Sequence, residues 1–72
     1  METETTGQRI KQALKTAGVT QRELARHAGV SEKSVGNWVA DRDQPKATHL
    51  AAMSSLLGVK GSWLLTGEQT VD

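Results

Sequence analysis

Residues 20–40, TQRELARHAGVSEKSVGNWVA, decide the fold of this chain. The hydroxyl of Thr20 can accept a hydrogen bond from an unpaired N–H of a first helical turn, and Glu23 can return that bond to Thr20. Gly29 then ends the helix, because a left-handed backbone conformation costs little only where there is no Cβ. Ser31 begins the next helix as its N-cap. The stretch therefore predicts two short helices joined by a tight turn.

The second of these helices has an apolar and a polar side. At about 100° per residue, one side carries three apolar residues: Val35, Trp38 and Val39. Lys33 and Asn37 lie almost opposite, so we expect them to project outward. Gly36 lies beside them, and we expect it to allow close approach to Ala25 of the preceding helix. The pattern predicts a helix that is held to the body by one side and exposed on the other.

The N-terminal part of the chain predicts one further helix. It can begin at Thr5 or Thr6 as N-cap and end near Gly18. The apolar residues expected on its inner side are Ile10, Ala13, Leu14 and Ala17. The polar residues expected on its outer side are Gln8, Arg9, Lys11, Gln12 and Lys15. For most of that outer side, simple solvation is the expected role.

The C-terminal part predicts two helices after a break at Pro45, whose ring removes a backbone donor and restricts the preceding residue. The first begins at Ala47 or Thr48 and ends before Gly58, with an inner set drawn from Leu50, Ala51, Met53, Ser54 and Leu57. A last short helix is expected over residues 62–65. The chain is thus predicted to be all-α, a compact bundle of about five short helices. We expect a disordered tail over residues 1–5, a domain over 6–66 and a tail or linker start over 67–72.

The composition limits the classes of function. The 72 residues include no cysteine, only two aromatic residues and 36% hydrophobic residues, which indicates one small domain with an aliphatic core. Disulfides and thiolate metal sites are therefore excluded, and a cytoplasmic location is expected. No stretch is long and apolar enough to suggest a membrane span. His27 and His49 have no carboxylate or thiol at ligand spacing, so we expect no catalytic site, metal, cofactor or small-molecule substrate.

The net charge of +1 hides an uneven distribution. Four of the eight acidic residues lie near the ends of the chain: Glu2, Glu4, Glu68 and Asp72. Residues 6–66 therefore hold nine basic and four acidic residues, a net charge of +5 (9 − 4). A basic body of this kind suits a partner that carries phosphates. A mixed, solvated surface is the other interpretation of the same charges.

The spacing of several residues resembles a known family. The run Gln21-x-x-Leu24-Ala25-x-x-Ala28-Gly29-Val30-Ser31-x-x-x-Val35-Gly36-x-Trp38 is similar to the helix-turn-helix of the lambda-repressor-like (XRE) DNA-binding proteins. Further residues resemble the end of phage repressor N-terminal domains: Pro45, Leu50 to Leu57, Gly58-Val59 and Trp63-Leu64-Leu65-x-Gly67. Residues 60–62 depart from the family, which tends to have a Ser or Asp cap there. We therefore expect the last helix to fray.

The resemblance implies which side chains meet DNA. The positions that read bases in the family are those of Glu32, Lys33, Ser34 and Asn37, and that of Gln21 contacts a phosphate. We assign Arg22, Arg42 and Lys46 to phosphates as well. Lys33 can donate to guanine and Asn37 can pair with adenine. Glu32 can accept from cytosine, repel wrong sites or stabilise the start of its own helix, and these three roles stay open.

The family further implies a transcriptional repressor of phage type, which binds a two-fold operator on double-stranded DNA as a homodimer. It is compatible with a whole Cro-sized regulator and with the N-terminal part of a longer repressor. We expect Trp63 and Leu64, or Leu65, to close the core or to face a second subunit. The alternative is a protein-interaction module, an antitoxin or adaptor, which uses the same bundle without reading bases.

Overall fold

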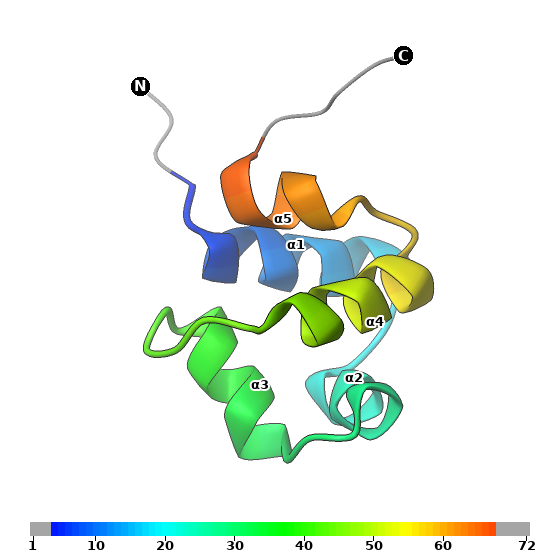
Figure 1. Ribbon diagram of the computed structural model, residues 1–72. Coiled ribbons are helices and arrows are strands. Elements are labelled where there is room, and N and C mark those ends of the chain that lie inside the picture. The colour runs from blue at the N-terminus through cyan, green and yellow to red at the C-terminus, as the bar shows by residue number, and fades with distance from the viewer. Residues whose placement is uncertain (1–3, 68–72) are drawn as a thin grey trace.

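The computed structural model describes residues 4–67, and within this range the chain forms five helices and no strand (Figure 1). The helices are α1 (Thr6–Ala17), α2 (Gln21–Ala28), α3 (Glu32–Val39), α4 (Ala47–Leu57) and α5 (Gly61–Thr66). This confirms the expected all-α bundle. The ends that we assigned to tails, residues 1–3 and 68–72, lie outside the described residues.

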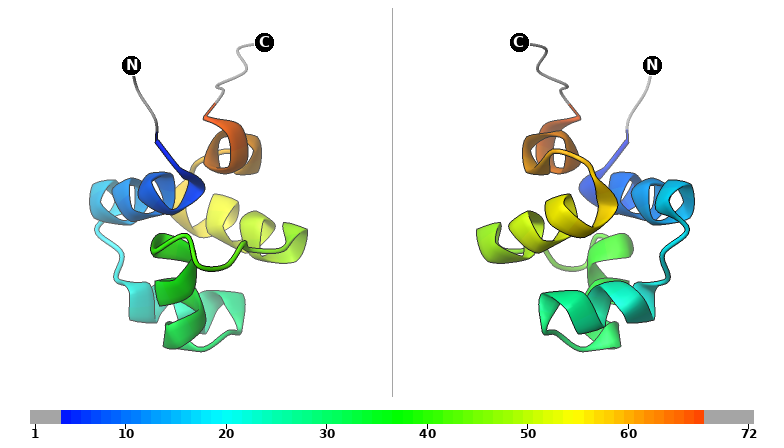
Figure 2. Two further views of the ribbon diagram at one scale, coloured as in Figure 1. Left: turned by 90° about the vertical axis from the view of Figure 1, so that its left-hand side faces the viewer. Right: turned by 90° about the vertical axis from the view of Figure 1, so that its right-hand side faces the viewer.

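The helices form three levels. Helices α1 and α4 contact each other in the middle, α2 and α3 pack beneath them, and α5 packs on the other side, against α1 and α4 (Figures 1 and 2). Helix α3 also contacts α1 directly. The helix-turn-helix pair α2 and α3 and the short α5 therefore lie on opposite sides of the middle level.

The helix ends follow the expected caps. The Thr20 hydroxyl accepts from the Glu23 N–H at 3.0 Å, and the Glu23 carboxylate accepts from the Thr20 N–H at 2.9 Å. At the start of α1, Thr5 and Gln8 exchange the same two bonds, at 3.0 and 3.1 Å. Gly29 has a φ of +73°, as the end of α2 requires. Because Thr5 is the N-cap of α1, the last part of the expected 1–5 tail belongs to the folded body.

The core lies between the levels and is aliphatic apart from Trp38. Five side chains are fully buried: Ile10, Leu24, Val35, Met53 and Leu64. Two alanines that we expected on inner sides, Ala17 and Ala51, are exposed. Residues 15–17 are all exposed, so the last turn of α1 extends beyond the core, although the apolar spacing continues through it.

Arg9 contradicts its expected place on the outer side of α1. It is only 6% exposed, and its guanidinium donates to three carbonyls: those of Leu64 at 3.0 Å, Leu65 at 2.8 Å and Glu4 at 3.0 Å. Carbonyls near the end of a helix lack intrahelical partners and carry partial negative charge. Helix α5 begins without a side-chain cap, as expected from residues 60–62, but Arg9 holds its last turn.

The close approach between helices occurs at a different glycine from the one expected. A Cβ on Gly36 would meet only Gln21 Oε1, at 3.9 Å, so the predicted contact with Ala25 is wrong. A Cβ on Gly7 would lie 2.4 Å from the carbonyl oxygen of Val39 and 2.6 Å from that of Trp38. Gly7 thus allows the first turn of α1 to lie directly against the end of α3.

Candidate nucleic-acid interface

Helix α3 is held to the body by one side only. Val35 is fully buried and Trp38 nearly so, while Val39 is half-buried against the same core. On the other side of the helix, Lys33 is exposed, which confirms its expected outward projection, whereas Asn37 is half-buried and its side chain contacts Arg42. Figure 1 shows that no other helix lies below α3. The polar side of α3 is therefore open to a partner.

The turn between α2 and α3 fixes the angle of the pair. The Val30 N–H donates to the Ala25 carbonyl at 3.0 Å, and the half-buried Val30 side chain packs against the core. Gln21, at the start of α2, is half-buried, and a Cβ added to Gly36 would lie 3.9 Å from its side-chain oxygen. The amide of Gln21 thus lies beside α3, where it can support a contact made by that helix.

The segment after α3 is tied to the start of α1. Asp41 has a φ of +61°, which is uncommon for a residue with a side chain. Its carboxylate accepts from the Gly7 N–H at 2.9 Å and from the Thr5 hydroxyl. A carboxylate is stabilised at a helix N-terminus, where N–H groups are unpaired. This role of Asp41 was missed, because its partners lie 34 and 36 residues earlier in the sequence.

Arg42 returns from that turn to α3. Its backbone N–H donates to the Asn37 carbonyl at 2.9 Å, and its Nη1 donates to the Asn37 side-chain oxygen at 3.3 Å. We had assigned Arg42 to a phosphate and Asn37 to a base. The structure joins the two side chains, and nothing in the spacing of the sequence indicated this bond.

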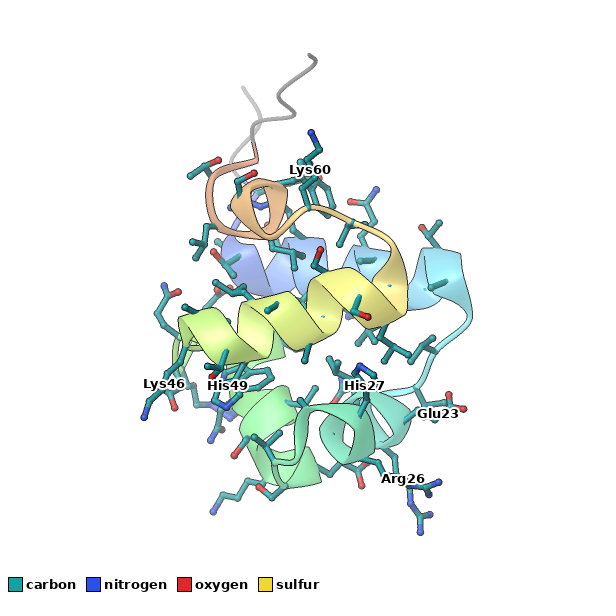
Figure 3. The ribbon with its side chains drawn as sticks, turned by 45° about the vertical axis from the view of Figure 1, so that its right-hand side comes forward. Glu23, Arg26, His27, Lys46, His49 and Lys60 are labelled. Carbon is teal, nitrogen blue, oxygen red and sulfur yellow. The ribbon has the colours of Figure 1, made fainter. Side chains whose placement is uncertain are left out.

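His49 lies in the first turn of α4, where its ring faces Trp38 of α3. Its ring is 4.9 Å from that of Trp38, centroid to centroid, and its Nδ1 accepts from the Lys46 N–H at 3.2 Å. This bond makes His49 part of the N-terminal cap of α4. Figure 3 shows Lys46 and His49 side by side, with Glu23 and Arg26 at the other end of the molecule. His49 thereby fixes the backbone that carries Lys46.

The charged side chains that we assigned to DNA are exposed, and all but Glu32 are basic. The side chains assigned to DNA all lie on α2, on α3 or in the segment before α4: Gln21, Arg22, Glu32, Lys33, Ser34, Asn37, Arg42 and Lys46.

Hydrogen bonds from the backbone and side chain of Thr20, and the charge of Arg26, lower the pKa of Glu23 below its ordinary value of 4.5. Within residues 4–67 there is no group of three acidic, histidine or cysteine side chains that could hold a metal ion. No helix there is long and apolar enough to cross a bilayer.

A comparison with known families identifies this architecture. The sequence profile described as helix-turn-helix matches residues 10–64, well over half of the chain. The chain belongs to the helix-turn-helix family.

Individual relatives of this helix-turn-helix domain agree. The transcriptional regulator DicA of Escherichia coli (strain K12) is 35% identical over 71 residues, and the match covers 96% of this chain and 53% of DicA. The chain thus spans about half the length of that curated relative. The P22 c2 repressor, solved with a synthetic operator, has a TM-score of 0.85 at 29% identity, over 92% of this chain and 100% of that one. SinR of Bacillus subtilis, solved with DNA, has a TM-score of 0.75 at 33% identity, over 83% and 97%.

The last helix of this helix-turn-helix domain decides between the two roles expected of Leu64, closing the core or facing a second subunit. Leu64 is 0% exposed, so it closes the core and offers no surface to a second subunit. Leu65 is 45% exposed and Trp63 is half-buried. A helix this short turns one residue fully inward, and the apolar run did not show which of the three it was. The apolar surface that α5 leaves accessible therefore belongs to Trp63 and Leu65.

Proposed function

We propose that this chain is the sequence-specific DNA-binding domain of a transcriptional regulator, and that α3 reads double-stranded DNA. The observation that carries the proposal is the open polar side of α3, held in place by the buried Val35 and Trp38. In a helix-turn-helix, the second helix enters the major groove and the first crosses the backbone. The P22 c2 repressor and SinR, which share this fold, were solved in complex with DNA, and this supports DNA as the partner.

The base contacts are assigned to Glu32, Lys33, Ser34 and Asn37. Glu32 and Lys33 are in the first turn of α3 and exposed, which is where a recognition helix meets base edges. The Lys33 ammonium can donate to the acceptors of guanine. The Glu32 carboxylate, at the positive end of its own helix, can accept from cytosine or repel sites that lack one. Selection of sequences by a Glu32→Gln variant separates these two roles.

The phosphate contacts are assigned to Gln21, Arg22, Arg42 and Lys46. They lie before and after the reading residues along the chain, and the three basic members are exposed. Contacts of this kind orient a protein on the duplex without reading its sequence, and they make binding weaken as salt rises. The net charge of +5 (9 − 4) over residues 6–66 supports this assignment.

A repressor that binds as a homodimer is the form of regulator that we propose. One recognition helix reads only a few base pairs, so a useful site needs two copies of the domain about 34 Å apart. Trp63 and Leu65 of α5 are the apolar side chains we assign to contact between the copies. Helix α5 packs on α1 and α4, away from the polar side of α3, so contact between copies through Trp63 and Leu65 leaves that side open. Occupying an operator would then block transcription.

Selection of bound duplexes from a random pool tests the proposal. We expect enriched sequences with two-fold symmetry and half-sites about one helical turn apart. The matched control is a Lys33→Ala, Asn37→Ala variant, which should retain the fold and salt-sensitive binding but lose the enrichment. Absence of any enriched sequence with the unaltered chain would refute base reading and favour the protein-interaction module.

A further inference from the structure

We propose that Arg42 sets the base preference of Asn37, so that the pair selects guanine over adenine. This inference rests on the proposed function, because it concerns one base-pair position of the site that α3 reads, which is one column in an alignment of bound sequences. It also changes the role of Arg42 from a phosphate contact alone to a residue that determines specificity through another side chain.

The first step is the geometry of the pair. Arg42 makes two hydrogen bonds to the same residue, one from its backbone N–H to the Asn37 carbonyl at 2.9 Å and one from Nη1 to the Asn37 side-chain oxygen at 3.3 Å. The Asp43 N–H donates to the same carbonyl at 3.4 Å. The backbone bonds keep the guanidinium near the amide that it contacts. The amide of Asn37 is therefore oriented before any DNA is bound.

The second step is the reason that Arg42 stays there. Asp41, directly before it, takes a left-handed conformation with a φ of +61°. The Asp41 carboxylate is bound by the Gly7 N–H and the Thr5 hydroxyl at the start of α1. This residue turns the chain back towards α3, and α1 holds the turn. Arg42 is exposed, but the backbone that carries it is held at both ends of this turn.

The third step is the chemistry that the pair presents. An asparagine side chain has one acceptor oxygen and an NH₂ donor, whereas a guanidinium has donors only. Arg42 binds one of the two lone pairs of the Asn37 oxygen and puts a positive charge beside the other, so the pair offers mainly N–H donors outward. Guanine shows two acceptors in the major groove, N7 and O6, whereas adenine shows one acceptor and an amino donor. A cation beside the Asn37 oxygen favours O6 of guanine and disfavours the amino group of adenine.

The test uses selection from a random pool with five proteins: the unaltered chain, Arg42→Ala, Asn37→Ala, the double variant and Lys46→Ala. The column read by Asn37 is the one that loses its preference in Asn37→Ala. We expect guanine there for the unaltered chain. In Arg42→Ala the ratio of guanine to adenine should fall by about tenfold, which is within the range of one base contact.

Two of these proteins serve as controls. Lys46→Ala removes an exposed charge from the same segment, and the bond that Lys46 makes to His49 comes from its backbone. It should weaken binding to all sequences and leave the ratio unchanged. In the Asn37→Ala background, Arg42→Ala should change the affinity for DNA but not the base preference at any position. Circular dichroism checks that each variant is folded.

The outcomes separate the inference from the proposed function. No enrichment by the unaltered chain would overturn the proposed function and the inference with it. Enrichment with the same ratio in Arg42→Ala, or with adenine already preferred by the unaltered chain, would overturn the inference alone. An equal shift in Lys46→Ala would also overturn it, because the effect would then be one of charge and not of orientation.

Discussion

Gly7 provides the sharpest test of how α3 is held. In Gly7→Ala, the added Cβ would lie 2.4 Å from the Val39 carbonyl oxygen and 2.8 Å from the Val39 carbonyl carbon. With ordinary van der Waals contact beginning at about 3.5 Å, these distances are about 1.1 and 0.7 Å too short. The atoms that it meets belong to the backbone, so no side chain can rotate away. The end of α3 must move from α1, or the first turn of α1 must unwind.

The cost can be estimated from comparable changes. Adding a methyl group where there is no room costs about 1–3 kcal/mol. Because the atoms in the way are backbone, we take the upper part of this range, about 2–3 kcal/mol; alanine in a helix returns about 1 kcal/mol relative to glycine, which leaves a net loss of about 1–2 kcal/mol. A small domain without disulfides or metals has about 3–5 kcal/mol of stability in all. With about 4–8 °C per kcal/mol, the melting temperature should fall by about 10 °C.

Thermal unfolding followed by circular dichroism measures this shift, and Gly36→Ala is the matched control. At Gly36 the added Cβ would meet only Gln21 Oε1, at 3.9 Å, so that variant should be as stable as the unaltered chain or up to about 1 kcal/mol more stable. The packing argument is refuted if Gly7→Ala melts no lower than the unaltered chain, or if both variants lose stability equally.

Three further predictions concern stability and binding. Arg9→Met removes three hydrogen bonds made by a buried guanidinium, so the free energy of unfolding measured in urea should fall by about 2–4 kcal/mol. Arg9→Lys should restore only part of this loss, because an ammonium cannot reproduce the geometry of the guanidinium. An unchanged urea midpoint in Arg9→Met would contradict the role assigned to Arg9. Because the pKa of Glu23 is lowered in the folded state, its carboxylate contributes stability above pH 4.5 that is lost as the pH falls further. In Glu23→Gln the urea midpoint should therefore decline less steeply on acidification than in the unaltered chain. An equally steep decline would contradict this role of Glu23. Lys33→Ala should reduce the preference at one base position by about 1–3 kcal/mol. Arg22→Ala should weaken binding to all sequences alike and reduce the slope of log affinity against log salt concentration by about one ion. Both are measured by titration with labelled duplexes, and a uniform loss of affinity for Lys33→Ala would make Lys33 a phosphate contact.

The parts of the fold that were predictable depend on neighbours in the sequence. The Thr20 and Glu23 cap, the stop at Gly29 and the buried side of α3 all involve residues within one or two turns of each other, and periodicity reveals such pairs. The exposed side of α3 followed from the same pattern. The part of the candidate site that lies on α3 alone could therefore be predicted from the sequence.

The parts that were missed depend on residues far apart in the sequence. Arg9 binds carbonyls 55 and 56 residues later, and Asp41 binds groups at the start of α1. No local pattern distinguishes a buried arginine from a solvated one when a distant helix end covers it. Gly36 was a plausible site of close approach, but the crossing of α1 and α3 at Gly7 depends on tertiary geometry.

The buried guanidinium of Arg9 also determines where the described chain enters and leaves the domain. It binds the Glu4 carbonyl at one end and the Leu65 carbonyl at the other, so these two points lie within the span of one side chain. Proteins whose ends lie close together tolerate being inserted into another protein or having their ends rejoined. The domain is therefore suited to circular permutation, with a short linker across this junction and new termini cut into an exposed connection elsewhere.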